Sequence, residues 1–130
     1  MDRVNPQDKQ EVLDWFEKYC NGFRNAKTRE NILPFIFIYR TFKSYEAKDR
    51  YFRRIASELI HEGHLCSHNS KGYWFIPLVT NDREEIAALK ESILEREAKA
   101  RSMIRDCSKQ LKRVEDLEKV INQGQMEMAV

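Results

Sequence analysis

YEAKDRYFRRIASELIHEGHLCSHNSKGYWFIP, residues 45–77, is the stretch of sequence that decides the fold of this 130-residue chain. Its first part, residues 45–62, predicts a helix, because apolar residues recur at helical spacing until Gly63 can end the helix in a left-handed conformation. The remainder has alternating runs on both sides of the polar turn Asn69–Gly72, which predicts a β-hairpin. The apolar face of the helix consists of Phe52, Ile55, Ala56, Leu59 and Ile60.

A second helix is predicted at the beginning of the chain. Asn5 supplies a capping side chain, and Pro6 occupies the first helical position, where a missing N–H costs nothing. The helix should run to about Cys20, since an apolar stripe at helical spacing ends there. The stripe consists of Val12, Leu13, Phe16 and Tyr19.

A further helix is expected between these two. Thr28 is its predicted cap, although Pro34 also permits a start near Asn31 or a kink. Residues 32–42 are almost continuously apolar, which favours an element buried on most sides. A buried strand is the alternative for this run.

Three helices followed by a hairpin is the element order of a winged helix. We therefore expect residues 1–80 to form a mostly α winged helix-turn-helix domain with a small β-hairpin. In a two-stranded wing, half of the aromatic residues must cover the core. We expect Tyr73 and Phe75 to pack there and Trp74 to be exposed.

Residues 81–122 predict one long helix, with Asn81 and Asp82 at its start and Asn122–Gly124 as its stop. Its length of roughly 60 Å exceeds the roughly 25 Å width of a winged domain, so most of it must leave the domain. A seven-residue apolar repeat favours coiled-coil pairing in a homodimer, while folding back or a different protein partner remain alternatives. Residues 123–130 are expected to be a flexible tail. The core positions of the repeat hold Ile86, Ile93, Ala100, Cys107, Val114 and Ile121, and Leu89, Met103 and Leu117, with Arg96 and Gln110 in the same seam.

Basic residues are concentrated in the front part of the chain. The net charge is only +2, but residues 1–80 carry 13 Lys and Arg against 10 Asp and Glu. A helix-turn-helix places the exposed face of its third helix in the major groove of DNA. We therefore predict base-edge contacts from Arg50, Arg53 or Arg54, with Ser57 on the same face, and phosphate contacts from Arg40, Lys43, Lys48 and Lys71. A solvated face with ion pairs such as Asp49 to Arg53 is the alternative.

Three segments, DRYFRRI (49–55), ELIHEGHLCS (58–67) and NSKGYWF (69–75), carry a resemblance to a known family. They resemble the small winged-helix proteins of bacteriophages and prophages, which have an Asp-Arg-x-x-Arg third helix, a Gly-Tyr return strand and a long charged C-terminal helix. The similarity covers residues 45–120. It implies binding of double-stranded DNA in phage replication or transcription, with Arg50 and Arg53 on the DNA side. The chain departs from the family at residues 32–42, which are bulkier and contain Pro34.

A possible zinc site is the cluster of His61, His64, Cys66 and His68 within eight residues. Their spacing fits no paired-ligand pattern, and His61 belongs to a helix whereas Cys66 and His68 share one side of a strand. Structural or DNA-facing histidines are therefore expected, and no metal or cofactor is predicted.

The remaining features favour a non-enzymatic protein. No Gly-rich phosphate loop, nucleophile elbow or HExxH pair is present. Three widely spaced cysteines suit free thiols in a reducing compartment, and neither a signal peptide nor a membrane-spanning run is recognisable. These features predict a cytoplasmic protein, in the bacterial host cell if phage-encoded. Because the net charge is modest, an interaction module that engages a host or replication protein is the alternative function.

Overall fold

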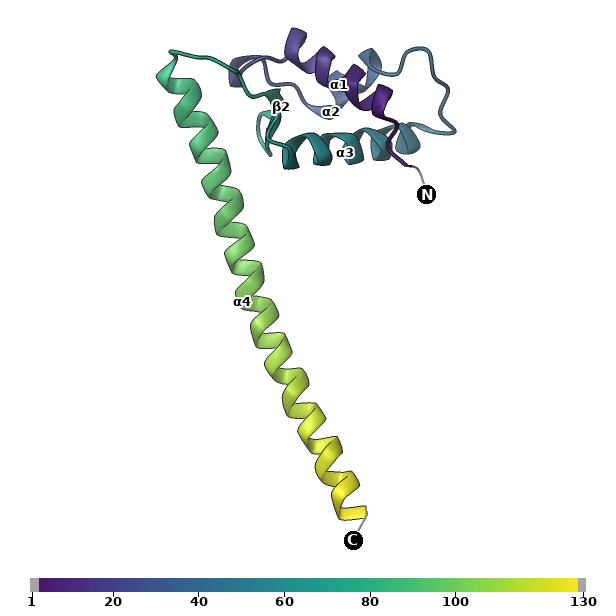
Figure 1. Ribbon diagram of the computed structural model, residues 1–130, viewed down its shortest axis with the longest axis vertical. Helices are drawn as coiled ribbons and strands as arrows, with labels where there is room; N and C mark the ends of the chain where they lie inside the picture. The colour runs from purple at the N-terminus through teal and green to yellow at the C-terminus, as the bar shows by residue number, and fades with distance from the viewer. Residues whose placement is uncertain (1–2, 129–130) are drawn as a thin grey trace. The chain divides into compact units, whose positions relative to one another are not determined.

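The computed structural model describes residues 3–128. Within this range the chain is mostly helical, with an antiparallel hairpin and a long C-terminal helix, as predicted (Figure 1). It divides into two units, the first ending at Ser92 and the second beginning at Ile93. The elements in chain order are α1 (Pro6–Tyr19), the 3₁₀ helix η1 (Phe23–Asn25), α2 (Arg29–Ile32), the 3₁₀ helix η2 (Leu33–Phe35), α3 (Tyr45–His61), β1 (Leu65–His68), β2 (Gly72–Phe75) and α4 (Arg83–Met128).

The core of the first unit lies between α1 and α3. Both helices start with side-chain caps. Asn5 accepts a hydrogen bond from the backbone of Gln7, as predicted, and Ser44, which was not predicted as a cap, accepts one from the backbone of Ala47. The rings of Phe16 and Phe52 stack with centroids 6.2 Å apart, which joins the apolar faces of the two helices. The buried cluster consists of Val12, Phe16, Cys20, Ile32, Leu33, Ile36, Phe37, Tyr51, Phe52, Ile55, Ala56, Leu59, Leu65 and Phe75.

The hairpin forms with the predicted turn, and its return strand also pairs with the segment before α2. Cys66 lies opposite Trp74, and Leu65 lies opposite Phe75. On the other edge of β2, the backbone groups of Lys27 and Tyr73 exchange two hydrogen bonds of 2.9 and 3.0 Å. The sequence analysis missed this antiparallel bridge. It fixes the hairpin to the chain that enters α2.

The prediction for residues 32–42 was wrong in both of its forms. The α-helix α2 has only four residues, η2 adds one 3₁₀ turn around Pro34, and residues 36–44 are irregular. Phe37 has a positive φ of 55°, which neither a helix nor a strand continues through. The apolar residues therefore divide: Ile36 and Phe37 are buried, while Phe35 is 62% and Tyr39 95% exposed.

The expectation that Trp74 is exposed was also wrong, since its side chain is fully buried. Tyr73 points to the α3 side of the hairpin, where its ring meets Phe52 edge-on at 5.4 Å. Trp74 lies on the opposite face together with Cys66, whose sulfur lies 3.5 Å from the hydroxyl of Ser92 in α4. The first turns of α4 thus cover the face that we expected to meet solvent.

Helix α4 begins as predicted and ends later. The carboxylate of Asp82 accepts a hydrogen bond from the backbone of Glu84, as expected of a cap. The predicted stop at Asn122–Gly124 was wrong, because the helix continues to Met128. A single glycine costs a helix only about 1 kcal/mol, and no proline follows it. Residues 123–128 are therefore helical and not a flexible tail, while the last two residues of that predicted tail lie outside the described residues.

The start of α4 is fastened to the first unit by Glu85. Its side chain is 5% exposed, and its two carboxylate oxygens accept the backbone N–H of Phe23 at 2.8 and 3.1 Å. On the same side of the helix Ala88 and Ser92 are also buried. The first turns of α4 therefore belong to the first unit.

We expect Glu85→Ala to lower the free energy of unfolding by about 1–3 kcal/mol, because the N–H of Phe23 loses its acceptor in a partly buried place. Glu85→Gln keeps an acceptor oxygen in a side chain of nearly the same volume. Its free energy of unfolding should therefore fall clearly less than that of Glu85→Ala. Urea unfolding followed by circular dichroism measures both variants. Equal stability of the alanine and glutamine variants would contradict this role of the carboxylate.

Candidate nucleic-acid interface

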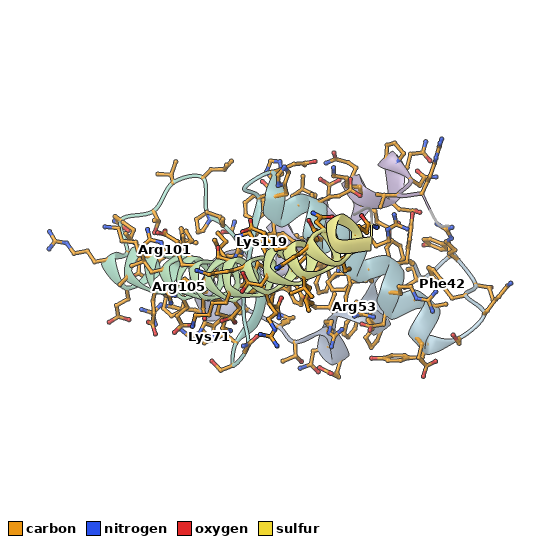
Figure 2. All side chains as sticks on the ribbon, turned by 90° about the horizontal axis from the view of Figure 1, so that it is seen from below. Phe42, Arg53, Lys71, Arg101, Arg105 and Lys119 are labelled. Atoms are coloured by element: carbon orange, nitrogen blue, oxygen red, sulfur yellow. The ribbon has the colours of Figure 1, made fainter. Side chains whose placement is uncertain are left out.

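The outward face of α3 is basic. Its buried face holds Tyr51, Phe52, Ile55, Ala56 and Leu59, so the side chains half a turn away point to solvent. The exposed side chains on this outward side are Arg50, Arg53, Arg54, Ser57 and His61, together with the acids Glu46 and Glu58. Figure 2 labels Arg53 on this helix. The structure thus brings together on one helix face all four of the predicted base-contact residues.

The carboxylate of Asp49 forms ion pairs with two basic side chains near this face. Asp49 accepts the guanidinium of Arg53 at 3.2 Å and that of Arg29, from α2, at 3.1 Å. Arg29 was missed by the sequence analysis, because nothing in its local sequence indicates a partner 20 residues away. The described part of the chain shows no ion pair for Arg50, which is exposed.

The acidic side chains at the C-terminal end of α3 also form ion pairs. Lys9 of α1 lies 3.3 Å from the carboxylate of Glu58 and forms a hydrogen-bonded ion pair with Glu62. The hydrogen bond from Lys9 lowers the pKa of Glu62 and raises that of Lys9. These pairs are exposed, so they add little stability. Their effect is to supply a compensating positive charge to two acids beside the arginines.

The predicted phosphate contacts at the N-terminal end of α3 lie in different environments. Arg40 forms an ion pair with Asp8 and packs over the rings of Phe42 and Tyr51, at 5.4 and 4.9 Å from their centroids. Its guanidinium therefore also holds the loop before α3 against α1. Lys43 is exposed, whereas Lys48 is half-buried and its pKa is lowered by that burial.

The last predicted phosphate contact, Lys71, lies at the tip of the hairpin, as Figure 2 shows. Its ammonium is 5.1 Å from the ring centroid of Phe23, and the guanidinium of Arg24 is 4.9 Å from the same centroid. Arg24 also forms ion pairs with Asp82 and Glu84, so its charge is already compensated within the protein. The hairpin tip lies beyond the opposite end of α3 from Lys43.

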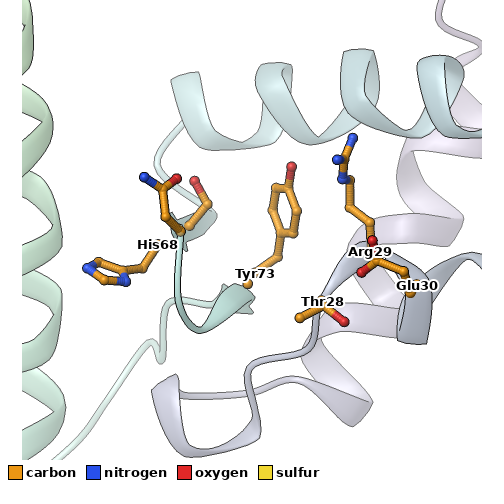
Figure 3. A pocket seen from close by; sticks show the side chains of 8 residues that line it. Thr28, Arg29, Glu30, His68 and Tyr73 are labelled. Atoms are coloured by element: carbon orange, nitrogen blue, oxygen red, sulfur yellow. The ribbon is translucent and has the colours of Figure 1, made fainter.

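A polar pocket of about 300 Å³ lies between the hairpin and the start of α2 (Figure 3). Thr28, Arg29 and Glu30 line one side, and His68 and Tyr73 belong to the other. The side chains of Arg29 and Tyr73 both point toward α3. Burial raises the pKa of Tyr73, and the nearby charge of Arg29 opposes this shift.

An apolar hollow of about 460 Å³ occupies a different part of the first unit. It is lined by Trp15, Tyr19, Lys27 and Phe35. The rings of Trp15 and Phe35 are nearly parallel, 13° apart, with centroids separated by 6.4 Å. This surface was not predicted, because residues 32–42 were expected to be buried.

The structure does not assemble the histidines and Cys66 into a metal site. Among the described residues, no group of three or more His, Cys, Asp or Glu is close enough to hold an ion. Cys66 is buried against Ser92, whereas the ring of His68 lies 2.8 Å from the hydroxyl of Ser70. Cys20, Cys66 and Cys107 are all free thiols, as expected, and burial raises the pKa of Cys20 to about 11.

The predicted oligomerisation residues divide between the two units. Leu89 is half-buried and Ile86 is 42% exposed on the part of α4 that belongs to the first unit. The others are exposed on the second unit: Ile93, Ala100, Met103, Cys107, Val114, Leu117 and Ile121. No described helix has the length and apolar character that a membrane span requires.

Comparisons with protein-family models, with curated proteins and with solved structures found no match to this chain. The similarity to phage winged-helix proteins therefore stays a prediction.

Proposed function

We propose that the protein binds double-stranded DNA as a winged helix-turn-helix, with α3 in the major groove and the β1–β2 hairpin lying over the backbone as the wing. The observation that carries this proposal is the outward face of α3, where Arg50, Arg53 and Arg54 are exposed side by side. Arginine on an exposed helix face is the commonest reader of guanine in the major groove.

Two of the three neighbouring acids support this assignment, because cations from other elements already compensate them, whereas the described residues show no ion pair for the third, Glu46. Arg29 pairs with Asp49, and Lys9 pairs with Glu58. When Arg53 turns from Asp49 to a base or a phosphate, Arg29 stays with the carboxylate. The exchange therefore leaves no unpaired charge in the protein.

The bridge between Lys27 and Tyr73 also supports a winged arrangement. It adds the segment between α1 and α2 to the hairpin as a third strand-like edge, so the wing is held at two edges of β2. One feature differs from an ordinary helix-turn-helix. Residues 36–44 separate η2 from α3, where such motifs have a turn of about three to four residues.

We further propose that the protein acts as a homodimer joined through α4, and that it serves phage replication or transcription. The dimer is supported by the exposed apolar residues of the second unit. The phage role is supported by the resemblance of residues 45–120 alone.

A second candidate is a protein-interaction module. It is favoured by the apolar hollow at Trp15, Tyr19 and Phe35, since exposed aromatic surface of this kind is typical of protein interfaces. In this function the winged unit would bind a host or replication protein and not DNA.

Salt-titrated binding to a random duplex, and to a single strand of the same sequence, tests the DNA proposal. Duplex affinity should fall linearly in a log–log plot, with a slope of about −3 to −4 for three or four phosphate contacts. The duplex should bind more tightly than the single strand. Failure to retain duplex DNA at low salt, together with stoichiometric capture of one protein partner, would favour the interaction module.

A further inference from the structure

The second unit leaves an apolar stripe of α4 uncovered. Nine large apolar side chains of residues 93–121 are between 45% and 67% exposed, and seven of them lie along this stripe. A stripe of this length on a monomer indicates an interaction surface. Its members are Ile93, Met103, Ile104, Leu111, Val114, Leu117 and Ile121.

We propose that residues 93–124 pair antiparallel with the same segment of a second copy, in the register that places Met103 opposite Val114 of the partner. This inference deepens the proposed dimer, and its consequence for DNA rests on the proposed function. Charge and shape along the stripe select both the direction and the register.

The seven-residue repeat defines the positions. With Ala100, Cys107 and Val114 at position a, Met103 and Gln110 occupy position d. An antiparallel pair places each a residue opposite a d residue. In the proposed register Ala100 faces Leu117, Met103 faces Val114 and Cys107 faces Gln110, so small side chains meet larger ones.

The residues that flank the seam carry the argument for direction. In an antiparallel pair, position e faces e and position g faces g. In this register Ile104 meets Leu111 of the partner, both at e and both apolar. On the other side Asp106 meets Arg113 of the partner, both at g and opposite in charge. The twofold symmetry repeats each contact, which gives two apolar pairs and two ion pairs near the centre. At the outer e positions Glu97 meets Glu118 of the partner, an exposed like-charge contact.

A parallel, in-register pair gains an ion pair between Arg113 and Glu118 of the partner but leaves the apolar flanking residues without apolar partners. It places Arg96 directly opposite Arg96 of the partner in the seam, which is repulsive. It also sets the apolar e residues against charged g residues, Ile104 against Lys99 and Leu111 against Asp106. The exposed apolar side chains at e are therefore explained by the antiparallel pair only.

Basic side chains on the rest of this segment do not obstruct the pairing. Arg101, Arg105 and Lys119, which Figure 2 labels on α4, occupy positions b and f of the repeat. These positions point away from the seam of a two-stranded pair. The basic side chains therefore stay in solvent.

The antiparallel direction has a consequence for DNA binding. Each Ile93, where the first unit joins the pair, lies opposite Gly124 of the partner. At 1.5 Å per residue, the two junctions are then about 46 Å apart along the pair. Half-sites read by a compact dimer are about 34–36 Å apart. The two DNA-binding units therefore join the pair at opposite ends, which would let the dimer bridge two separate duplex segments.

A charge swap in the full-length protein tests direction and register. Asp106→Arg and Arg113→Asp each convert the two ion pairs into like-charge contacts, and each should raise the dimer dissociation constant about tenfold. The double variant restores the pairs with reversed sign and should return to within about threefold of the original. In a parallel pair, the carboxylate that Arg113→Asp introduces would face Glu118 of the partner. The double variant would then still dimerise weakly. Sedimentation equilibrium measures the constants, and helix content by circular dichroism checks folding.

Cysteine cross-linking gives an independent answer in the Cys107→Ser background. Chains with Met103→Cys and differently tagged chains with Val114→Cys are mixed in a glutathione redox buffer. The proposal expects disulfides between the two kinds of chain, whereas a parallel pair would link each kind to itself. Self-linked products, or a monomeric protein, would overturn the proposal.

Bridging is measured separately, as capture of a labelled duplex by an immobilised duplex. If the antiparallel links form but no duplex binds to the protein at all, the DNA proposal fails and the pairing stands. If single duplexes bind and none is bridged, the inference of two separate segments is overturned.

Discussion

Replacement of Gly72 by alanine is expected to lower the free energy of unfolding by about 2–5 kcal/mol, a large part of the roughly 5–15 kcal/mol typical of a domain. Gly72 has a φ of +92°, which side chains rarely adopt. A Cβ at this residue would overlap the carbonyl oxygen of Lys27 and lie 2.8 Å from the backbone nitrogen of Thr28. Both obstacles are backbone, so neither can rotate away.

Gly63→Ala is the matched control for this prediction. Gly63 has a similar φ of +85°, but nothing lies within 4 Å of the place of its Cβ. The loss of unfolding free energy in Gly63→Ala should therefore reflect backbone conformation alone and amount to about 1–2 kcal/mol. The difference between the two variants in urea unfolding measures the close approach of the hairpin to residues 27–28. Equal losses would contradict a steric cost from the close approach of residues 27–28 to Gly72.

The parts of the fold that local sequence determines could be predicted. Asn5, Ser44 and Asp82 are polar caps placed just before periodic apolar runs, and the polar turn Asn69–Gly72 separates two short runs. Each of these signals acts within a few residues. The helices and the hairpin follow from them with little need of tertiary contacts.

The parts that failed depend on partners far away in sequence. Residues 32–42 are apolar enough for a buried element, but only some of them enter the core beside α1 and α3. Ile32, Leu33, Ile36 and Phe37 are buried there, whereas Phe35 and Tyr39 are exposed. Trp74 is buried because α4 returns to cover the second face of the hairpin. No periodicity in the hairpin itself indicates that cover.

The candidate interface shows the same division. The basic face of α3 could be read from helical spacing alone. The partners of its acids could not, because Arg29 and Lys9 reach Asp49 and Glu58 from α2 and α1. These partners decide which arginines are available to DNA.

The double variant Arg50→Ala/Arg53→Ala is expected to weaken duplex binding by about 2–6 kcal/mol, since a well-placed arginine contributes about 1–3 kcal/mol to base recognition. Its fold should be retained, because both side chains are exposed and Asp49 keeps its ion pair with Arg29. Fluorescence anisotropy with a labelled duplex measures the affinity, and thermal unfolding checks the fold.

Arg101→Ala/Arg105→Ala is the control, because it removes the same net charge from exposed positions of α4. If DNA is read by α3, this control should bind within about threefold of the unaltered protein, the small loss reflecting screened long-range attraction. Equal weakening by both double variants would mean that DNA affinity depends only on the total charge of the protein. The α3 face would then lose its special role, while an unchanged affinity in the α3 variant would remove it from the interface altogether. The comparison therefore separates a specific recognition helix from a merely basic protein, which a net charge of +2 leaves open.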